Sequence, residues 1–393
     1  MKSDFRKIEL PRSNLLNCEI ISDIDGFRRL RPEWSALLEK STAASFFLTY
    51  EYLWTWWNVY GARYNLRILA ARSADGRLVG LAPLMIGAGD NSKRRLLRNL
   101  AFIGGLGDTL SEYQDFIVAP GHETSVVARF VQALFDRLGA EWDLMQLGMV
   151  HAESPCLSPL RAAIAAAGGG LRFKGRHIAP YVGLPSSWDA YLASRSKSFR
   201  TGFKGRVGKL RRNHCVEFLT AGVEVDPVRA LSIITSLNQE RWGAQSRAFH
   251  SNKYREFHLR LAESLMPREQ SYIVVMTVDG EAVAAGYDLI YRQKVYGFQG
   301  GWKRSMARAA IGKIMLGKQI EWAIERGLTE YDFLCGDTAY KADWATGQRE
   351  LLDLEAMNPR SFRGIMFEKV RSLRNSLMEP VANIAVLRGG RGR

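Results

Sequence analysis

Metal-binding and disulfide patterns are missing from this sequence. Four cysteines occur in 393 residues, far apart and without CxxC or CxxH spacing: Cys18, Cys156, Cys215 and Cys335. The six histidines form neither an HxxxH nor an HxH pair. Zinc sites and disulfide frameworks need such spacings, so we expect reduced thiols and no metal. GxSxG and P-loop strings are also missing, which argues against hydrolase and NTPase chemistry.

Long apolar runs are missing as well. The opening MKSDFRKIEL mixes charged with apolar residues and lacks the continuous apolar core of a signal peptide. The nearest candidate for a membrane span, AAIAAAGGG after Arg161, is too short to cross a bilayer. We therefore expect a cytoplasmic protein, with contact at the periphery of the inner membrane as the alternative.

Acidic residues are in the minority. Lys and Arg total 55 against 40 Asp and Glu, which gives a net charge of +15. This excess favours an anionic partner such as a nucleotide cofactor, a nucleic acid or an acidic membrane surface. The chain length and the 47% hydrophobic content suffice for two buried cores. We expect two domains.

Two segments repeat in the same order, which indicates the duplication of one α/β domain. Residues 67–86 and 272–291 both read as strand, Asp-Gly turn, strand. Residues 128–148 and 317–336 both read as an amphipathic helix that ends at a glycine and leads into an apolar strand. The first copy has an extra glycine-rich stretch, roughly residues 87–121, to which the pattern assigns no role.

The boundary between the copies is expected near Pro185, where a serine pair precedes a helical pattern. Ser186 or Ser187 would begin this helix. The predicted organisation is a tail at 1–16, an N-terminal domain at 17–185, a C-terminal domain at 186–357 and a basic amphipathic tail at 358–393.

Helical spacing precedes the first hairpin. RPEWSALLEK (31–40) and YEYLWTWWNVYG (50–61) both show it, and Thr49 is the expected N-cap of the second helix. The second of these segments is rich in tyrosine and tryptophan. We expect these rings to pack in the core and between the domains rather than to bind a ligand.

A basic, glycine-containing stretch follows the strand KVYGFQGGW (294–302) and reads as the start of a helix. Gly312, after the small Ala310, would let phosphate oxygens approach the free backbone amides, and the helix dipole favours negative charge there. Three basic side chains add charge: Arg304, Arg308 and Lys313. An ordinary basic helix start without a ligand is the alternative.

The loop YDFLCGDTAYKADW (331–344) follows the second amphipathic helix. Tyr340 could protonate a departing thiolate, because a pKa near 10 suits an acid facing a sulfur leaving group. A tyrosine that only caps the strand end is the alternative. Such an acid would work with a base, and spacing does not separate the candidates Glu240, Asp288, Asp332 and Asp337.

The C-terminal half resembles the BioF2-like or CelD-like acetyltransferases of the GNAT superfamily, whose architecture is similar to that of the Fem peptidoglycan aminoacyltransferases. The motifs are Ile-Glu-Trp-Ala at 320–323, Tyr-Asp-Phe at 331–333, Gly-Asp at 336–337, and Tyr-Lys at 340–341 before Trp344. The resemblance extends over about residues 30–357. Ala310-Ile311 stand where the family usually has Ser-Pro.

This resemblance implies an α/β (α+β) fold with two tandem GNAT-like domains and an acyl-CoA site in the second. The pantetheine arm would lie along a splayed strand, at Phe298 and Gln299, and the pyrophosphate at the helix start described above. Tyr340 would be the acid, and Asp337 or Glu240 would take the proton from the acceptor. Further substrate contacts are expected from Trp242, Asp288, Asp332, Lys341 and Trp344. The first copy has no Tyr-Lys motif after its strand, so we expect it to be structural or to help form the acceptor cleft.

The implied function is acyl transfer from acetyl-CoA or another acyl-CoA to an amine. The acceptor would be an amino sugar or other small amine, either free or linked to a lipid or a nucleotide. The pathway implied is bacterial exopolysaccharide or adhesive-polysaccharide biosynthesis. One alternative is a Fem-like transferase that uses aminoacyl-tRNA. Another is a non-catalytic scaffold or nucleotide-responsive protein with the same fold.

Two basic segments remain. Eight basic residues and no acidic one occur between Arg195 and Arg212, a pattern typical of a solvated helix face or of a site for an acidic acceptor. Nucleic acid is not expected there, because no recognised binding motif accompanies the charge. The tail after Pro359 is amphipathic and is expected to dock on the second domain, with an anionic membrane or a regulatory nucleotide as the alternative.

Overall fold

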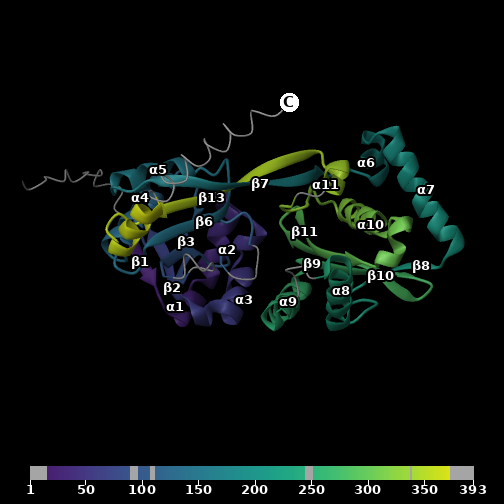
Figure 1. The fold of residues 1–393 in the computed structure, drawn as a ribbon, viewed down its shortest axis with the longest axis horizontal. Helices are drawn as coiled ribbons and strands as arrows, with labels where there is room; N and C mark the ends of the chain where they lie inside the picture. Colours follow the sequence, from purple (N-terminus) through teal and green to yellow (C-terminus); the bar gives the residue numbers. More distant parts are fainter. Residues whose placement is uncertain (1–15, 89–95, 107–110, 244–250, 337–338, 372–393) are drawn as a thin grey trace, which may run out of the picture.

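The computed structural model describes residues 16–88, 96–106, 111–243, 251–336 and 339–371. These residues form one mixed sheet of 13 strands, with helices packed on both faces (Figure 1). Along the sheet the strands follow the order β1-β2-β3-β4-β6-β13-β7-β12-β11-β10-β9-β8, and β5 pairs with β3 off this path.

The first copy runs from β1 to β7. Its strands are β1 Asn17–Ile21, β2 Asn65–Arg72, β3 Leu78–Ala88, β4 Arg98–Phe102, β5 Ile117–Val118, β6 Leu144–His151 and β7 Leu171–Gly183. Its α-helices are α1 Ile24–Arg29, α2 Arg31–Lys40, α3 Tyr50–Tyr60, α4 Glu123–Asp136 and α5 Leu157–Ala166. Short 3-10 turns flank α3 at Phe46–Leu48 and Gly61–Arg63.

The second copy repeats this order. Its strands are β8 Val216–Thr220, β9 Ser271–Val278, β10 Glu281–Tyr291, β11 Lys294–Trp302, β12 Glu330–Asp332 and β13 Gly347–Met357. Its α-helices are α6 Trp188–Ser194, α7 Lys197–Asn213, α8 Pro227–Trp242, α9 Asn252–Leu265, α10 Ile311–Glu325 and α11 Ala339–Trp344. Two 3-10 turns lie at Met266–Arg268 and Arg304–Ala309.

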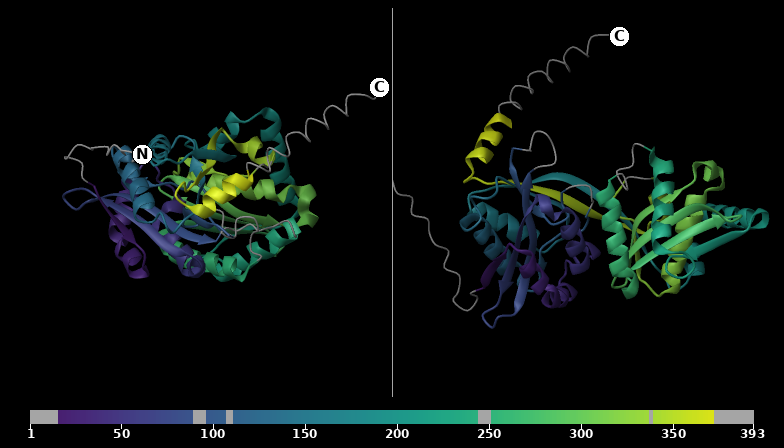
Figure 2. Two further views of the ribbon diagram at one scale, coloured as in Figure 1. Left: turned by 60° about the vertical axis from the view of Figure 1, so that its left-hand side comes forward. Right: turned by 90° about the horizontal axis from the view of Figure 1, so that it is seen from below.

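The two copies exchange their last strands. The final strand of the first copy, β7, pairs with β12 of the second, and β13 of the second copy pairs with β6 of the first. Between them, β7 and β13 form a long antiparallel ladder from Gly347↔Tyr181 to Ala356↔Leu171. Figure 1 shows these two strands running from one half of the molecule to the other, and the right-hand view of Figure 2 shows the same crossing from below. The hydrogen bonds of the sheet therefore join the two halves directly.

Local signals in the sequence correctly predict most of these elements. Both hairpins form, and Gly76 and Gly280 have positive φ angles of 83° and 81° in their turns. Thr49 caps α3, because its hydroxyl accepts the Tyr52 amide, and Ser187 caps α6 through the Ala190 amide. The basic segment forms a separate helix, α7, because α6 ends at its C-cap Arg195 and the next helix begins after its N-cap Ser196.

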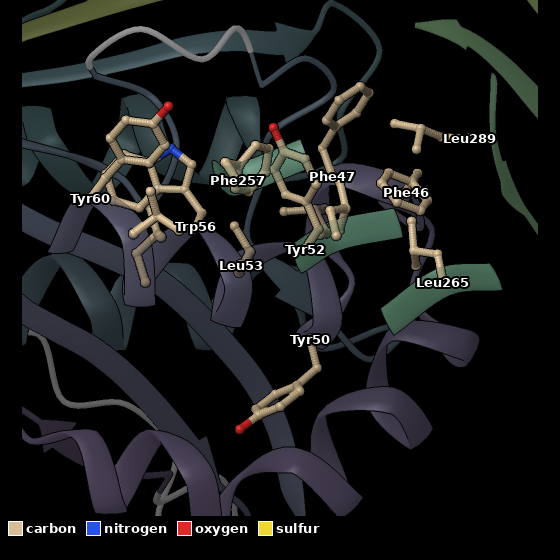
Figure 3. Packing of buried hydrophobic residues seen from close by; sticks show 14 of the residues in the cluster. Phe46, Phe47, Tyr50, Tyr52, Leu53, Trp56, Tyr60, Phe257, Leu265 and Leu289 are labelled. Atoms are coloured by element: carbon tan, nitrogen blue, oxygen red, sulfur yellow. The ribbon is translucent and has the colours of Figure 1, made fainter. Parts of the chain in front are cut away.

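The aromatic residues of α3 pack in the core and between the copies, as the sequence predicts. Tyr52 and Trp56 are fully buried. Tyr52 lies edge-on to Phe257 of α9, with ring centroids 5.4 Å apart. Phe47 lies edge-on to Tyr296 of β11, with ring centroids 5.9 Å apart. Figure 3 shows Phe257 beside this group of first-copy rings. A shared apolar core thus holds the helices of one copy against the sheet of the other.

The start of the C-terminal tail docks on the first copy, so the prediction that it docks on the second is wrong for residues 358–371. Ser361 Oγ donates to Asp143 at 2.5 Å, and Glu368 forms an ion pair with Arg172 of β7 at 2.8 Å. Because β13 ends beside β6, the residues after it are delivered to the first copy. No helix within the described ranges is long and apolar enough to cross a membrane.

Candidate active site in the second copy

The edge of β11 becomes free halfway along the strand. β11 and β12 pair in parallel at only three positions, from Lys294↔Glu330 to Tyr296↔Asp332. From Gly297 onward β11 continues to Trp302 without this neighbour, because β12 ends at Asp332. The backbone groups on this side of β11 are therefore available to a ligand that lies in the gap.

A cleft of about 580 Å³ opens at this gap, a size typical of sites for small ligands. Its lining comes from six parts of the chain: the segment before β5, α8, α9, β11 with β10 behind it, the start of α10, and the turn and helix after β12. Seven predicted site residues line it in addition to Lys341 and Tyr340: Trp242, Asp288, Phe298, Gln299, Ala310, Gly312 and Lys313.

Helix α8 forms one wall of the cleft and rests directly on β11. A Cβ on Gly301 would lie 2.4 Å from the backbone nitrogen of Asn238, so only glycine permits this approach of α8 to β11. The Asn238 side chain in turn donates to the Gly300 carbonyl at 3.0 Å. At the end of α8, the Arg241 guanidinium lies over Trp242 and over Trp302, 4.5 and 5.3 Å from the ring centroids.

The N-terminus of α10 forms the second wall. Ala310 has a φ of 55°, and no side chain in the described part of the chain caps the helix. The Lys313 and Ile314 amides donate to the Ala310 carbonyl, so the amides left for an anion are those of Ile311 and Gly312. Gly312 has a packing role that the sequence does not reveal, because its missing Cβ would lie 2.9 Å from the Trp302 indole. Lys313 reaches the same wall and forms an ion pair with Asp343 at 2.8 Å.

The turn after β12 and helix α11 form the third wall. Tyr340 lines the cleft next to Arg241. Burial lowers the pKa of Arg241, and a hydrogen bond with the Tyr340 side chain opposes that shift. Lys341 is buried and donates to the carbonyls of Leu334 and Cys335 at 3.1 and 2.9 Å. Its ammonium group therefore holds the turn in place.

A buried carboxyl group lies at the floor of the cleft. Both oxygens of Asp288 lie 2.8 Å from the Gln319 amide nitrogen, and Oδ1 also accepts the Tyr331 hydroxyl at 2.9 Å. Burial raises the pKa of Asp288 to about 7, against the effect of these hydrogen bonds. No cation among the described residues forms an ion pair with Asp288, so desolvation dominates its pKa.

Several predicted residues lie away from the cleft. Glu240 is exposed and accepts the Arg304 amide at 3.1 Å, while the Arg304 side chain holds the Arg241 carbonyl. Arg308 is exposed on the turn before α10. Trp344 is fully buried among Tyr191, Phe199 and Phe203. Asp337 lies outside the described residues.

Asp332 faces a different cavity, on the other side of the segment before β5. It accepts hydrogen bonds from the Tyr113 hydroxyl at 2.5 Å and from the Leu334 amide at 2.7 Å, and it forms an ion pair with Arg349. Burial raises its pKa to about 6. The structure therefore places Asp332 between the copies rather than in the cleft.

Sequence reasoning missed several residues that line the cleft, among them Asn238, Tyr254 and Glu112. Glu112 belongs to the first copy, and its Oε2 accepts the Cys335 amide at 2.8 Å across the boundary between the copies. It lies in the extra stretch at 87–121, whose pattern assigns no role to it. Only the glycine-rich character of that insertion, typical of a functional loop, could have directed attention there.

The equivalent gap in the first copy is bridged by the chain itself. β4 and β6 pair in parallel from Asn99↔Leu144 to Ala101↔Gln146, as β11 and β12 do. Beyond this point the Gln114 backbone amide donates to the Met149 carbonyl on one side, and the Gln114 side-chain amide donates to the Ile103 carbonyl on the other. The position that is open in the second copy is thus occupied in the first.

Groups of three or more side chains that could hold a metal ion do not occur within the described ranges. Each copy contains antiparallel strands, a helix that follows the free strand edge, and a parallel strand that diverges from that edge. This is the fold of two tandem GNAT domains.

Residues 197–342 match the family model described as "Acetyltransferase (GNAT) domain". This part of the chain is a GNAT-type acyltransferase domain, and the resemblance read from its motifs is confirmed. No curated protein sequence matches the chain.

Solved structures share the fold over most of the chain. FemX aligns with a TM-score of 0.60 and 11% identity, covering 85% of this chain and 96% of its own. L-PGS from Bacillus licheniformis has a TM-score of 0.50 and 15% identity over 87% and 96% of the two chains. A tandem GNAT protein from the clavulanic acid biosynthesis pathway has a TM-score of 0.50 and 14% identity over 88% and 100%. These likenesses confirm the predicted tandem fold.

Proposed function

We propose that the protein transfers an acyl group from acyl-CoA to an amine and that the reaction takes place in the cleft of the second copy. The observation that carries this proposal is the free edge of β11 beside the uncapped N-terminus of α10. A pantetheine arm offers amide groups that can pair with the β11 backbone. The pyrophosphate would then lie at the first turn of α10, where free amides and the helix dipole favour an anion.

Tyr340 is suited to act as the acid in this reaction. It lines the cleft from α11, and the Arg241 guanidinium at the end of α8 lies beside it and favours a developing negative charge. The acceptor nitrogen would attack the thioester carbonyl carbon, and the carbon–sulfur bond would break. The CoA sulfur would take its proton from the Tyr340 hydroxyl, which later regains one from solvent.

Trp242, Tyr254 and Gln299 line the part of the cleft that we assign to the acceptor. The Gln299 side-chain amide donates to the Tyr254 hydroxyl at 3.2 Å, and the Arg241 guanidinium lies over the Trp242 ring. Such a lining suits a polar molecule with hydroxyl groups and one amine, so we propose an amino sugar as the acceptor class. In this proposal the first copy binds no acyl-CoA, since Gln114 occupies its gap.

Calorimetric titration with acetyl-CoA and longer acyl-CoAs tests the proposal. Lys313→Glu places a negative charge at the α10 terminus and should weaken binding at least about tenfold, or about 1.4 kcal/mol. Lys318→Glu is the matched control, because it reverses the same charge on the same helix beside Glu321 and outside the cleft lining. Wild-type protein that binds no acyl-CoA would refute the proposal and favour a scaffold.

Tyr340→Phe should lower kcat by about 10²-fold or more with the acyl-CoA affinity retained.

Aminoacyl-tRNA is the second candidate donor, and helix α7 is the observation that favours it. Its basic side chains are largely exposed: Lys197, Lys204, Arg206, Lys209, Arg211 and Arg212. A row of exposed cations is suited to a phosphate backbone. Turnover with acyl-CoA as sole donor that survives ribonuclease treatment would exclude the tRNA-dependent reaction.

A further inference from the structure

The segment at residues 111–115 of the first copy is fixed between the two copies. Ser111 Oγ lies 2.9 Å from the Tyr52 hydroxyl in the first copy. Glu112 and Tyr113 both reach the second copy, where they bond the Cys335 amide and Asp332. Since contacts in both copies hold this segment, its side chains are positioned rigidly at the boundary.

Glu112 lies on the wall of the cleft that faces the free edge of β11. It is 5% exposed, and the Cys335 amide that it accepts belongs to the turn directly after β12. Lys341 holds the carbonyls of the same turn. A ligand lying between this turn and β11 would therefore have the Glu112 carboxyl group at its side.

The surroundings of Glu112 keep its carboxyl group near the midpoint of its titration at neutral pH. Burial raises its pKa to about 7, and Asp332 adds to the rise, whereas the Cys335 amide, the Cys335 thiol and Lys341 act in the opposite direction. Tyr52 and Tyr113 also lie near it on the first copy. A carboxyl group with such a pKa accepts a proton at neutral pH more effectively than an exposed one.

The other described acidic candidates are less well placed. Asp288 has both oxygens occupied by Gln319 and Tyr331 at the floor. Asp332 lines the other cavity, and Glu240 lies outside the cleft. Glu112 is thus the carboxyl group on the cleft wall, and its described hydrogen bonds go to the backbone amide and the thiol of Cys335.

We propose that Glu112 of the first copy is the base that takes the proton from the acceptor amine in the cleft of the second copy. The inference rests on the proposed acyl transfer. The nitrogen forms its bond to the acyl carbon and releases a proton to the Glu112 carboxylate, while the sulfur leaves with the Tyr340 proton. Glu112 then loses its proton to solvent. In this role the first copy supplies a catalytic residue to the cleft of the second.

Glu112→Gln tests the assignment, because the amide oxygen can still accept the Cys335 amide but the side chain cannot take a proton. We expect kcat to fall by about 10²-fold or more, with the calorimetric Kd for acyl-CoA changed less than twofold. In the wild type, kcat/KM should rise with pH through about 7 as the carboxyl group ionises, and this limb should be lost in the variant.

Asp115→Asn is the matched control. Asp115 lies on the same segment, is equally buried and has a pKa that burial also raises to about 7, but it lines the other cavity. Its variant should retain the wild-type kcat and pH profile. A similar loss of kcat in Asp115→Asn would assign the effect to the segment's conformation and overturn the role of Glu112.

The remaining outcomes separate this inference from the proposed function. Normal turnover and an unchanged pH profile in Glu112→Gln overturn the inference alone, whereas wild-type protein without acyl-CoA binding overturns both. If Glu112→Gln does not fold, Glu112→Asp replaces it. The shorter carboxylate should lower kcat while the limb near pH 7 remains, and an unaltered kcat there would count against the inference.

Discussion

The buried carboxyl group of Asp115 should make the protein more stable in acid than at neutral pH. Asp115 is 5% exposed and accepts the Phe116 amide at 2.7 Å and a hydrogen bond from Ser154. Burial nevertheless raises its pKa from an ordinary 3.8 to about 7. At about 1.36 kcal/mol per pKa unit, ionising this group in the folded protein costs about 4 kcal/mol more than in the unfolded chain.

The sign of the effect follows from the raised pKa in the folded state. The contribution of Asp115 to stability is fully present below pH 3.8, falls as the unfolded chain ionises, and is lost once the pH exceeds about 7. Asp115→Asn cannot ionise, and its amide can satisfy Phe116 and Ser154. The variant should therefore gain up to about 4 kcal/mol over the wild type at pH 8 and little at pH 4.

Urea denaturation of both proteins at several pH values between 4 and 8 measures this difference. The other buried carboxyl groups titrate in both proteins and cancel in the comparison. A difference that does not change with pH, or a variant that is less stable at pH 8, would refute the argument that desolvation governs this group.

Two further predictions concern the packing of the cleft. Gly301→Ala should lower the free energy of unfolding, measured with urea, by about 1–3 kcal/mol and weaken acyl-CoA binding, because the new Cβ would meet the α8 backbone. Gly205→Ala is the control: it has open space in α7 and should be neutral or stabilising. A harmless Gly301→Ala would show that α8 does not rest on β11. Lys341→Met should lower stability by about 1–3 kcal/mol, since the Leu334 and Cys335 carbonyls lose their donor, and an unchanged urea midpoint would contradict this role of the ammonium.

Elements with local signals were predicted well. The Asp-Gly turns, the Thr49 cap and the aromatic spacing of α3 depend on residues within a few positions of one another, so their consequences are visible in the sequence. The free edge of β11 beside the start of α10 was expected from the family resemblance and not from local signals, and the packing of Gly312 against Trp302 was not expected.

Residues that depend on distant partners were predicted less well. Trp344 was expected to contact substrate but lies in the core, because α6 and α7 fold back over it. Asp332 was a candidate base but pairs with Tyr113 and Arg349. Neither outcome follows from the residues next to it in the sequence.

The sequence alone determines the strands, the helices, their caps and the repetition of one GNAT unit, because these follow from short-range patterns of apolar residues and turn chemistry. Only the tertiary structure decides that the two copies exchange their last strands, since a strand can pair with any edge of suitable register. It also decides that Glu112 reaches Cys335, 223 positions away, and that burial raises the pKa of its carboxyl group. Desolvation depends on everything that surrounds a group in space, and that environment is built from both copies.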